Sequence, residues 1–579
     1  MKKIIALALA SALCLSLIAC TPKESASTQD SGQSETAADN TNETEKTADT
    51  ADTADTSDKA EEKTVDTGTQ ITLDGDSVEL TEGGTYTVSG TLSDGQIKVD
   101  TGEQEVTLVL NGVDITCSDD NAIEIKSTGK VTIIAQDGSE NTVTTPAGTD
   151  SYAAISSDGD LTLSGSGKLT VAAASGTGIH CEGVLTVDGG VYEVYSENNG
   201  LKGDSGVNIS DGTFTVVCAG DGIKTDSTTQ GSITITGGTF NITAGDDAIQ
   251  SEGDMDISGG DFTLTTNGGS SNAPVRERDG MGGPFGGGMY SSGSDSSDED
   301  ISAKGVKAEG TLNISGGTFN IDAYDDGLHA ANITIADGTF NIASGDDGVH
   351  SDGNLDIKGG SITVTYCNEG LEGAIITVDD GEIDITSYDD GINAAGGSEI
   401  TLIINGGTVK VDAAGDGLDS NGDMYINGGY VEVSGSENNG NAALDYASES
   451  GGTLIINGGT VVATGMSGMA EGVSSQSAQN NALVCFSGVL SAGDKVIVSD
   501  SNGNTVMEFT VTKSCNAVYI SSPDLESGQT YTVTGGGESI DVTFTSTVVT
   551  AGTASGGMMG GPGGFGGMGG PGMGGPGGR

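Results

Sequence analysis

The chain has 579 residues, of which 98 are glycine and none is tryptophan, and its formal net charge is −63. A chain this acidic repels nucleic acids and other polyanions unless cations intervene. The charge therefore argues against a nucleic-acid partner and favours cations, basic partners or neutral polymers. An aromatic content of 4% suits many short strands joined by tight turns rather than a large aromatic core.

The N-terminus has the pattern of a secretion signal. Lys2 and Lys3 precede an apolar run over residues 4–18 that is too short to span a membrane. The run ends in Leu-Ile-Ala-Cys, which resembles a bacterial lipobox. We therefore predict a lipoprotein signal peptide over residues 1–19 and a lipid on Cys20; an ordinary signal with a chance cysteine is the alternative. The expected location is extracytoplasmic and surface-exposed, with the membrane contacted only through the lipid.

Two terminal segments have the composition of disordered chain. Residues 20–66 are rich in Thr, Ser, Ala, Asp and Glu and have almost no large apolar side chains, which predicts a flexible acidic tether. Residues 551–579 consist mainly of Gly, Met and Pro, which predicts a disordered tail.

The body between these segments alternates apolar and polar residues between Gly, Asp and Asn turns, which is typical of β-strands. Over residues 67–150 the pattern is irregular and predicts an N-terminal cap with the first units of a repeat. A regular repeat follows over residues 151–480, with a Gly/Ser-rich insertion at 267–301. The period fades over residues 481–550, where we predict a small antiparallel β module that caps the repeat.

The regular repeat has a period of about 22 residues, which indicates stacked supersecondary units. Each unit holds two or three short strand-like runs and an acidic turn that ends in glycine. These features predict an all-β parallel β-helix in which equivalent residues of successive coils lie about 4.8 Å apart. One column of residues should then form an internal aromatic stack: Phe214, Phe240, Phe262, Phe319 and Phe340. The six cysteines after residue 20 lack metal-type spacing and are expected to be buried and unpaired.

A second column precedes the turn glycine in successive units, and most of its members are acidic. These residues are Thr177, Asn199, Asp221, Asp247, Lys304, Asp326, Asp347, Glu369, Asp390, Asp416 and Asn439. Further acids stand one residue earlier at Asp246, Asp325, Asp346 and Asp389, and Asp419 follows the column by three residues.

Stacked carboxylates of this kind require compensation. Two of them 4.8 Å apart repel by roughly 1 kcal/mol in water and about 3–4 kcal/mol at an effective dielectric constant of 20. Calcium, which prefers oxygen ligands, is the expected cofactor, and all the acids from Asp221 to Asp419 named above are its candidate ligands. The alternative is that aspartate precedes glycine because the pair forms good turns. Lys304 interrupts the acidic run.

A third column lies three residues after the second. It contains His180, Lys202, Lys224, Gln250, Lys307, His329, His350, Glu372, Asn393 and Asp419. We interpret it as the polar wall of a binding groove, with His329, His350, Glu372 and Asn393 as ligand-binding residues and Tyr324 and Tyr388 beside them as stacking platforms. A transition-metal site at the two adjacent histidines lacks a third ligand, and a histidine copied along with a duplicated unit explains the pair more simply.

These repeats resemble bacterial carbohydrate-binding, pectate-lyase-like proteins with a right-handed parallel β-helix. The resemblance covers roughly residues 70–545 and rests on "GTYTVSGTLSDGQIKVD", "VTLVLNGVDIT", the repeated "GGTFNI…DDGIH/N" units and "SSPDLESGQTYTV". It implies calcium held by the acidic turns and binding of cellulose-like or acidic plant polysaccharides. The calcium roles transfer most directly to Asp325, Asp326, Asp346, Asp347, Asp389 and Asp390.

The sequence thus predicts a monomeric cell-surface protein that binds calcium and polysaccharide without cleaving the polymer. One alternative is a calcium-dependent polysaccharide lyase, for which Lys202, Lys224 or Lys307 would supply the base. Against a lyase, these lysines occupy repeat positions, whereas a catalytic base usually stands alone in an irregular site. A structural surface adhesin is the other alternative.

Overall fold

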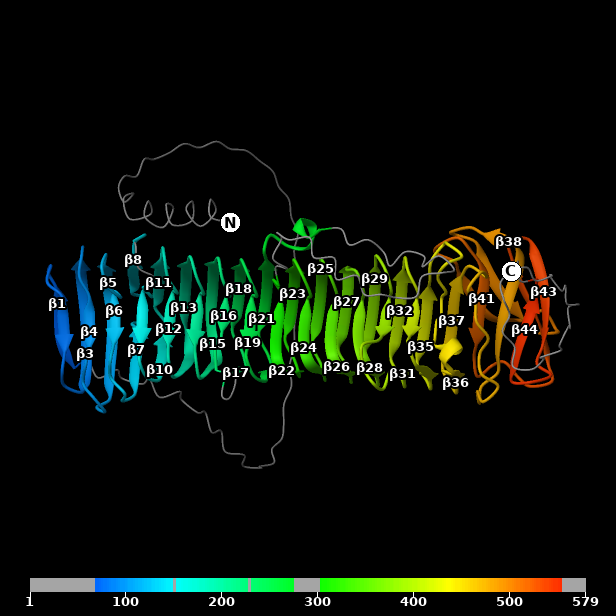
Figure 1. The fold of residues 1–579 in the computed structure, drawn as a ribbon, viewed down its shortest axis with the longest axis horizontal. Coiled ribbons are helices and arrows are strands. Elements are labelled where there is room, and N and C mark those ends of the chain that lie inside the picture. The colour runs from blue at the N-terminus through cyan, green and yellow to red at the C-terminus, as the bar shows by residue number, and fades with distance from the viewer. Residues whose placement is uncertain (1–67, 149–151, 228–230, 275–301, 554–579) are drawn as a thin grey trace, which may run out of the picture.

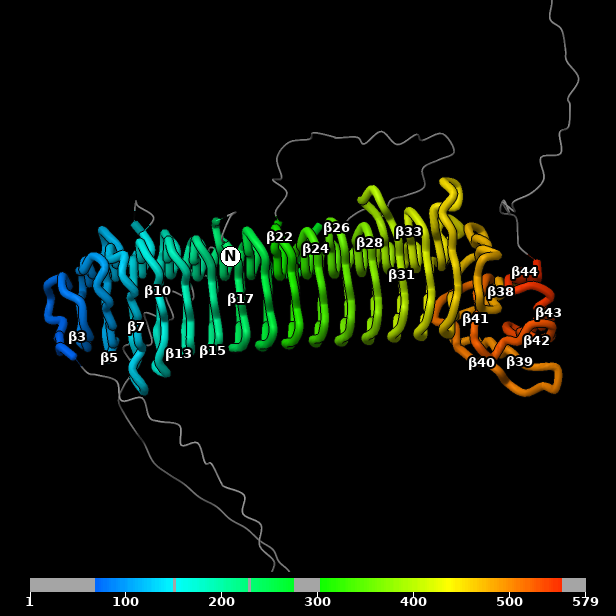
Figure 2. Tube along the Cα trace, turned by 90° about the horizontal axis from the view of Figure 1, so that it is seen from below, coloured from blue at the N-terminus to red at the C-terminus, as the bar shows by residue number. Residues whose placement is uncertain are grey.

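The computed structural model describes residues 68–148, 152–227, 231–274 and 302–553. The described chain forms a straight rod of stacked coils, with the N-terminal coils at one end and the last strands at the other (Figures 1 and 2). The rod is a β-solenoid of about 14 turns with a roughly 23-residue repeat, which confirms the predicted parallel β-helix. The predicted signal peptide, Cys20, the tether, most of the insertion and nearly all of the tail lie outside the described residues.

Each coil contributes to three parallel faces, which we number in chain order after the acidic turn. Face 1 contains the short strands β2 (Val78–Leu80), β4 (Ile97–Val99), β6 (Ile123–Ile125), β9 (Ile155–Ser157), β12 (Ile179–Cys181), β14 (Leu201–Gly203), β16 (Ile223–Lys224), β19 (Ile249–Ser251), β30 (Ile392–Ala394) and β33 (Leu418–Ser420). Face 2 contains β1 (Thr69–Leu73), β7 (Val131–Ala135), β10 (Leu161–Gly165), β17 (Ser232–Ile235), β20 (Met255–Ile257), β31 (Thr401–Ile404), β34 (Asp423–Ile426) and β36 (Leu454–Ile456).

Face 3 carries the aromatic column. It contains β8 (Glu140–Thr145), β11 (Lys168–Ala173), β18 (Thr239–Ala244), β21 (Asp261–Thr266), β23 (Thr318–Ala323), β25 (Thr339–Ser344), β27 (Ser361–Tyr366), β29 (Glu382–Ser387), β32 (Thr408–Ala413), β35 (Tyr430–Ser434) and β37 (Thr460–Gly465). Longer strands turn the corner between two faces: β3 (Gly84–Leu92), β5 (Val106–Thr116), β13 (Val184–Ser196), β15 (Gly206–Cys218), β22 (Val306–Ile314), β24 (Leu328–Ile335), β26 (Val349–Ile357) and β28 (Leu371–Val378).

The interior is built from columns of equivalent residues. The predicted phenylalanine stack is confirmed, and its ring centroids are 4.9, 4.7, 4.5 and 4.7 Å apart along the series from Phe214 to Phe340. Tyr192 extends the stack by one ring at 5.2 Å from Phe214, and its hydroxyl donates to the carbonyl of Gly189 at 2.7 Å. The cysteines at 117, 181, 218, 367, 485 and 515 are buried and unpaired, as expected. The stacked apolar columns therefore fix the register of every coil.

The two ends of the rod differ. At the N-terminal end, β1 already pairs in parallel with β3, so the irregular segment from Thr69 belongs to the same stack as the regular coils. At the other end, β37 pairs antiparallel with β41 (Cys515–Ser521), which also pairs with β38 (Asn481–Leu490). Parallel stacking therefore stops at β37.

The last strands form a C-terminal β module. β44 (Val548–Gly552) pairs with β38, while β39 (Lys495–Ser499), β40 (Thr505–Thr510), β42 (Thr530–Gly535) and β43 (Glu538–Thr543) make a separate four-stranded sheet. This module has a hydrophobic cluster of its own. Two short 3-10 turns occur at η2 (Ser270–Asn272) and η3 (Ser448–Ser450). Within the described ranges, no helix has the length and apolarity needed to cross a bilayer.

The start of the predicted insertion packs against the rod. Asn267 has a positive φ of 43°, and the N–H and hydroxyl of Ser270 donate to Oδ1 of Asp322 at 2.7 and 2.8 Å. Ser270 therefore ties the start of the insertion to β23, which carries Asp322.

Candidate functional site

The acidic column is a hydrogen-bond ladder that runs along the rod. In each step, a side-chain oxygen of one coil accepts the backbone N–H of the equivalent residue on the next coil. The acceptor–donor distances are 2.9 Å for Asn199–Asp221, 3.1 Å for Asp221–Asp247, 2.7 Å for Asp247–Lys304, 3.1 Å for Asp326–Asp347, 3.3 Å for Asp347–Glu369 and 2.6 Å for Asp390–Asp416. The column therefore has a structural role, because each step satisfies a backbone donor.

Each step of this ladder requires a hydrogen-bond acceptor on the side chain rather than a negative charge. Asn199 fills its step as well as the aspartates do. One oxygen of each laddered aspartate accepts a backbone N–H, which reduces but does not remove its capacity to bind a cation. Asp221, Asp247 and Asp326 are almost fully buried.

The end of the column differs from the sequence prediction. Ala442, and not Asn439, occupies the column position on the coil after Asp416. The N–H of Ala442 donates to Oδ1 of Asp416, and Leu418 forms a β-bridge with Leu444. The loop after β35 is three residues longer than the sequence prediction assumed, and this moves the column position from residue 439 to residue 442. A fixed spacing from the turn glycine could not reveal this shift.

In the first part of the column, lysines neutralise the second carboxylate oxygens. Lys224 Nζ lies 2.7 Å from Asp221 Oδ2. Lys304 Nζ lies 2.6 Å from Asp325 Oδ2 and also bonds Asp326 Oδ2, and the lysine is only 7% exposed. Burial lowers the pKa of Lys304, but the attraction of the two aspartates outweighs burial and raises it overall. Lys304 therefore acts as a resident cation for the acids that surround it.

Beyond Asp347 the column has no such lysine. Among the described residues, Glu369, Asp390, Asp416 and Asp419 form no ion pair with Lys or Arg. Burial, with repulsion from Asp416 next, raises the pKa of Asp390 to about 8. Burial also raises the pKa of Glu369 to about 8, of Asp419 to about 8 and of Asp416 to about 7, with neighbouring carboxylates adding to each shift.

Asn393 completes this region, which we call the C-terminal acid cluster: Glu369, Asp390, Asn393, Asp416 and Asp419. The Nδ2 of Asn393 donates to Glu369 Oε2 at 2.9 Å, and Asn393 pairs in register with Asp419. Its Oδ1 is buried without a hydrogen-bond partner. An amide oxygen and carboxylates without a basic partner are the donor types that calcium prefers, although the acids of this cluster are not among the groups whose ligand atoms all lie within 4.8 Å of one another.

Acids elsewhere in the column also gather closely. Ligand atoms of Asp221, Asp246 and Asp247 lie within 4.8 Å of one another, and so do those of Asp325, Asp326 and Asp346. Burial raises the pKa of Asp247 to about 7, whereas the second group already contains the ammonium of Lys304. The predicted metal ligands thus include lysine-paired acids at Asp221, Asp325 and Asp326, and acids without a lysine ion pair at Asp247 and in the C-terminal acid cluster.

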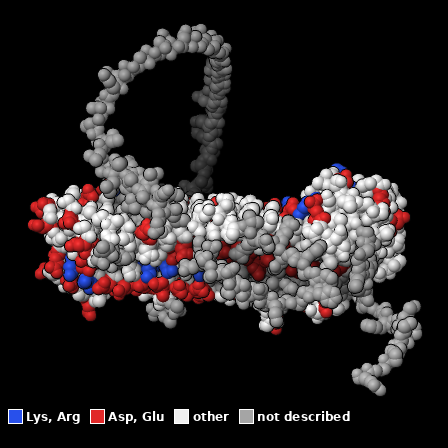
Figure 3. Space-filling view, turned by 45° about the horizontal axis from the view of Figure 1, so that its top comes forward, with Lys and Arg blue, Asp and Glu red and all other residues white. Residues whose placement is uncertain are grey.

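The third column lies on face 1 in the predicted register. Neighbouring pairs run from His180–Lys202 through Lys307–His329, His329–His350 and Glu372–Asn393 to Asn393–Asp419. Tyr388 is 43% exposed at the turn that leads to Asp389, while Tyr324 is half-buried. Tyr366, which is 45% exposed, is a further exposed aromatic side chain that adjoins this region. Acidic side chains follow the long axis of the rod, with basic side chains beside them in its N-terminal half (Figure 3).

The lysines considered as a catalytic base are held in ion pairs. Lys202 Nζ lies 2.6 Å from Asp226 Oδ2 and 3.1 Å from Asp204 Oδ1, and Lys307 Nζ lies 2.9 Å from Glu309 Oε1. Burial lowers the pKa of Lys202, yet its bonds to Asp226 and Asp204 leave the pKa raised. A raised pKa favours the protonated form, whereas a base that removes a proton must be neutral.

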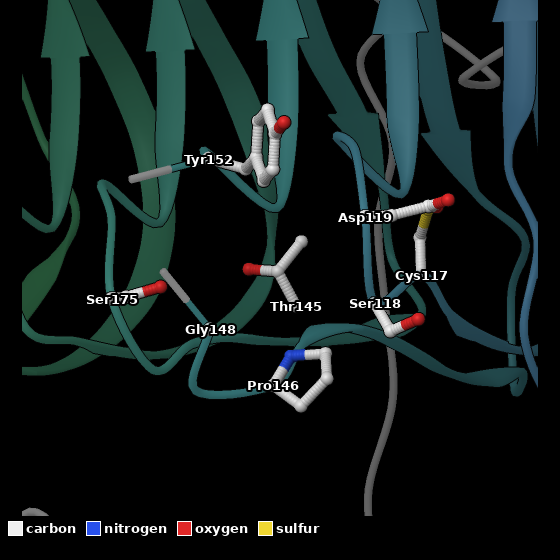
Figure 4. Close-up of a pocket in the computed structure, with 8 residues that line it drawn as sticks. All are labelled: Cys117, Ser118, Asp119, Thr145, Pro146, Gly148, Tyr152 and Ser175. Atoms are coloured by element: carbon white, nitrogen blue, oxygen red, sulfur yellow. The ribbon is translucent and has the colours of Figure 1, made fainter. Parts of the chain in front are cut away.

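Two cavities lie away from the predicted site residues. A cavity of about 110 Å³ near the N-terminal end is lined by Cys117, Ser118, Asp119, Thr145, Pro146, Gly148, Tyr152 and Ser175 (Figure 4). A larger cavity of about 480 Å³ lies in the C-terminal module beside Asp500 and Tyr531. None of the predicted site residues lines either cavity.

Comparison with known proteins places the chain in a family. A curated protein of Acetivibrio thermocellus, described as a carbohydrate-binding domain-containing protein, is 42% identical over 122 residues, which are 20% of this chain. The matched part spans about 43% of that relative's length. A solved structure described as a polysaccharide lyase-like protein from C. thermocellum, in a gadolinium derivative, is 35% identical, with a TM-score of 0.34, and covers 43% of this chain and 90% of its own. The profile of the family described as carbohydrate-binding domain-containing protein matches residues 74–348 and 346–546, so the chain belongs to this family.

Proposed function

We propose that this protein binds acidic plant-type polysaccharide in a calcium-dependent manner, at the outer surface of the cell, and does not cleave the polymer. Family membership supports carbohydrate binding in general. The observation that carries the calcium-dependent part is the C-terminal acid cluster, where Asn393 Oδ1 is buried without a partner among carboxylates that have no basic neighbour.

Calcium would serve two purposes at this cluster. It would neutralise carboxylates whose burial, and then whose mutual repulsion, favours their protonated forms, and it would present positive charge to the carboxylates of a uronate polymer. Without calcium, the charge of −63 repels such a polymer. Tyr366 and Tyr388 are exposed next to the cluster and offer rings against which sugars can stack. Asn393 is only 8% exposed, so we assign it to the ion rather than to the polymer.

The proposal predicts calcium-dependent retention on pectic acid. Full-length protein should bind immobilised polygalacturonate in calcium and elute when a chelator is added. Asp390→Asn should weaken retention by about tenfold or more through loss of a charged ligand, since tenfold corresponds to about 1.4 kcal/mol. The asparagine keeps the oxygen that accepts the Asp416 N–H, as Asn199 does in its own step, so the ladder is preserved.

Asp384→Asn is the matched control, because Asp384 is exposed on face 3 and does not belong to the column. Equal retention with and without chelator would contradict the calcium requirement. A steady rise in ultraviolet absorbance from unsaturated sugar products would show that the protein cleaves the polymer. If Lys202→Ala abolished this rise, the lyase would be the correct function.

The proposed location is tested separately at Cys20. We expect Cys20→Ala to leave the membrane fraction or to remain uncleaved, because the lipid is the only membrane contact that we propose. Cell fractionation followed by mass measurement of the mature N-terminus decides this point. A variant that stays in the membrane fraction with a processed N-terminus would disprove the anchor.

A further inference from the structure

One step of the third column joins a histidine to an acid, at His350 on β26 and Glu372 on β28. These two residues pair in register on face 1, so Glu372 lies on the coil directly after that of His350. At His180 and His329 the next coil instead supplies Lys202 and His350. Among the described coils, the step from His350 to Glu372 is therefore the only one in this column at which an acid follows a histidine.

Three donor atoms converge at this step. His350 Nδ1 lies 3.2 Å from Asp347 Oδ2 and 3.5 Å from Glu372 Oε2. Ligand atoms of the three residues all lie within 4.8 Å of one another. Two ligands of one tetrahedral metal with bonds of about 2.0–2.1 Å are separated by about 3.4 Å. The two distances from the imidazole nitrogen bracket this separation, so one ion fits between the three atoms after small side-chain adjustments.

The surroundings hold the donors in place and leave them without an ammonium group. Asp347 is 3% exposed, and its Oδ1 accepts the N–H of Glu369 at 3.3 Å, so the ladder leaves Oδ2 to face His350. In the part of the chain that the structure describes, Asp347 and Glu372 form ion pairs with His350 and with no Lys or Arg. The two carboxyl groups are hydrogen-bonded to each other, which requires a proton between them or a cation in its place.

The equivalent place one coil earlier is already filled. His329 Nδ1 lies 2.8 Å from Asp326 Oδ2, and the same oxygen accepts a hydrogen bond from Lys304 Nζ. Lys224 Nζ likewise lies 2.7 Å from Asp221 Oδ2. The contact between a third-column side chain and the acid three residues before it is thus an ordinary feature of the repeat. What distinguishes the next coil is a second carboxylate in place of an ammonium.

We propose that Asp347, His350 and Glu372 bind one divalent transition metal such as Zn²⁺ through Oδ2, Nδ1 and Oε2, with a fourth coordination position open to solvent. One imidazole nitrogen and two carboxylates are ligands that zinc uses, whereas calcium prefers oxygen ligands alone. Nδ1 must be unprotonated in this role, so the ring proton lies on Nε2. The side chains of His350 and Glu372 are 26% and 23% exposed, which gives the ion a path of entry. This site goes beyond the proposed calcium-dependent binding of polysaccharide.

Zinc titration of the full-length protein in excess calcium tests this site. Calorimetry should show one zinc ion bound per chain. His350→Ala should weaken zinc binding by more than about 100-fold, which is the upper end of the loss expected from removing an outer-shell partner alone. Glu372→Lys should have an equally large effect, because it removes one ligand and introduces an ammonium. Lys224 shows that this column accepts a lysine, so the fold should be kept.

His180→Ala and His329→Ala are the matched controls, because both histidines occupy the same column and neither has an acid on the next coil. Their zinc affinity should stay close to that of the unmodified protein. Histidine ring NMR gives a readout in the unmodified chain: zinc should bind Nδ1 of His350 and leave the ring proton on Nε2. Failure to bind zinc in excess calcium, metal on Nε2, or an equal loss in His329→Ala would overturn the proposal. Retention on pectic acid is measured in calcium alone, so its failure is distinguishable from failure of the zinc site.

Discussion

Protein freed of metal by a chelator is expected to lose stability as the pH rises from about 4 to about 8. The fold raises the pKa of Glu369, Asp390 and Asp419 to about 8 and that of Asp416 to about 7, mainly through burial. The same groups titrate near 4 in the unfolded chain. The folded state therefore binds more protons in this interval, so its stability is complete below pH 4 and declines until the pH exceeds the folded-state pKa values.

The loss should be on the order of several kcal/mol, since each unit of pKa difference corresponds to about 1.4 kcal/mol. Calcium should remove most of the loss at pH 8, because the ion binds the ionised carboxylates of the folded state only. Denaturant unfolding at pH 5, 6.5 and 8, with chelator and with calcium, measures both effects. Asp419→Asn should flatten the profile of the chelated protein. Identical unfolding midpoints at pH 5 and pH 8 in chelator would contradict this prediction, because they would show that other charges already compensate these carboxylates in the folded protein.

Replacing Lys304 with methionine is expected to destabilise the rod by about 3–5 kcal/mol. This range is the usual cost of removing one partner from a buried ion pair, because the remaining charges lose their compensation. Lys304 is 7% exposed and its ammonium bonds both Asp325 and Asp326. Methionine keeps much of the stem that packs in the interior, so the change tests the charge more than the volume.

The Lys304→Met variant should also become more dependent on calcium than the unmodified protein. A divalent cation can replace the missing ammonium between Asp325, Asp326 and Asp346, whose ligand atoms lie within 4.8 Å of one another. Lys130→Met is the control, because Lys130 is exposed and a surface change of this kind costs about 0.5 kcal/mol or less. Equal denaturation midpoints for the two variants would contradict the neutralising role of Lys304.

The coil register could be predicted because it depends on a spacing that the sequence displays directly. Once the turn glycines are aligned, Phe319 must lie on Phe340 and His329 on His350, and the structure has both pairs. Where the loop length changes, this reasoning fails, as at Ala442. The stack also begins one coil earlier than predicted, at Tyr192, because a tyrosine was not counted as equivalent to phenylalanine.

The interactions within the site could be predicted less well. Lys304 looked like an interruption of the acidic run, yet its side chain extends to the next coil and neutralises two of its acids. Asp352 belongs to a repeated acidic position two residues after the third column, which also holds Asp204, Asp226 and Glu309, and this column was not recognised in the sequence. The ladder of backbone N–H groups on carboxylate oxygens was not anticipated either, because acceptor geometry depends on side-chain direction rather than on spacing.

The regular stacking of coils also bears on how such a site can originate. The step from Asp326 to Asp347 is 21 residues, and it carries the aromatic, acidic and histidine columns forward together. A gene duplication of one whole coil lengthens the rod by one strand spacing of about 4.8 Å and preserves every pairing. Coils of 22 and 26 residues also keep the column in register. Two neighbouring histidines can thus arise in one genetic event.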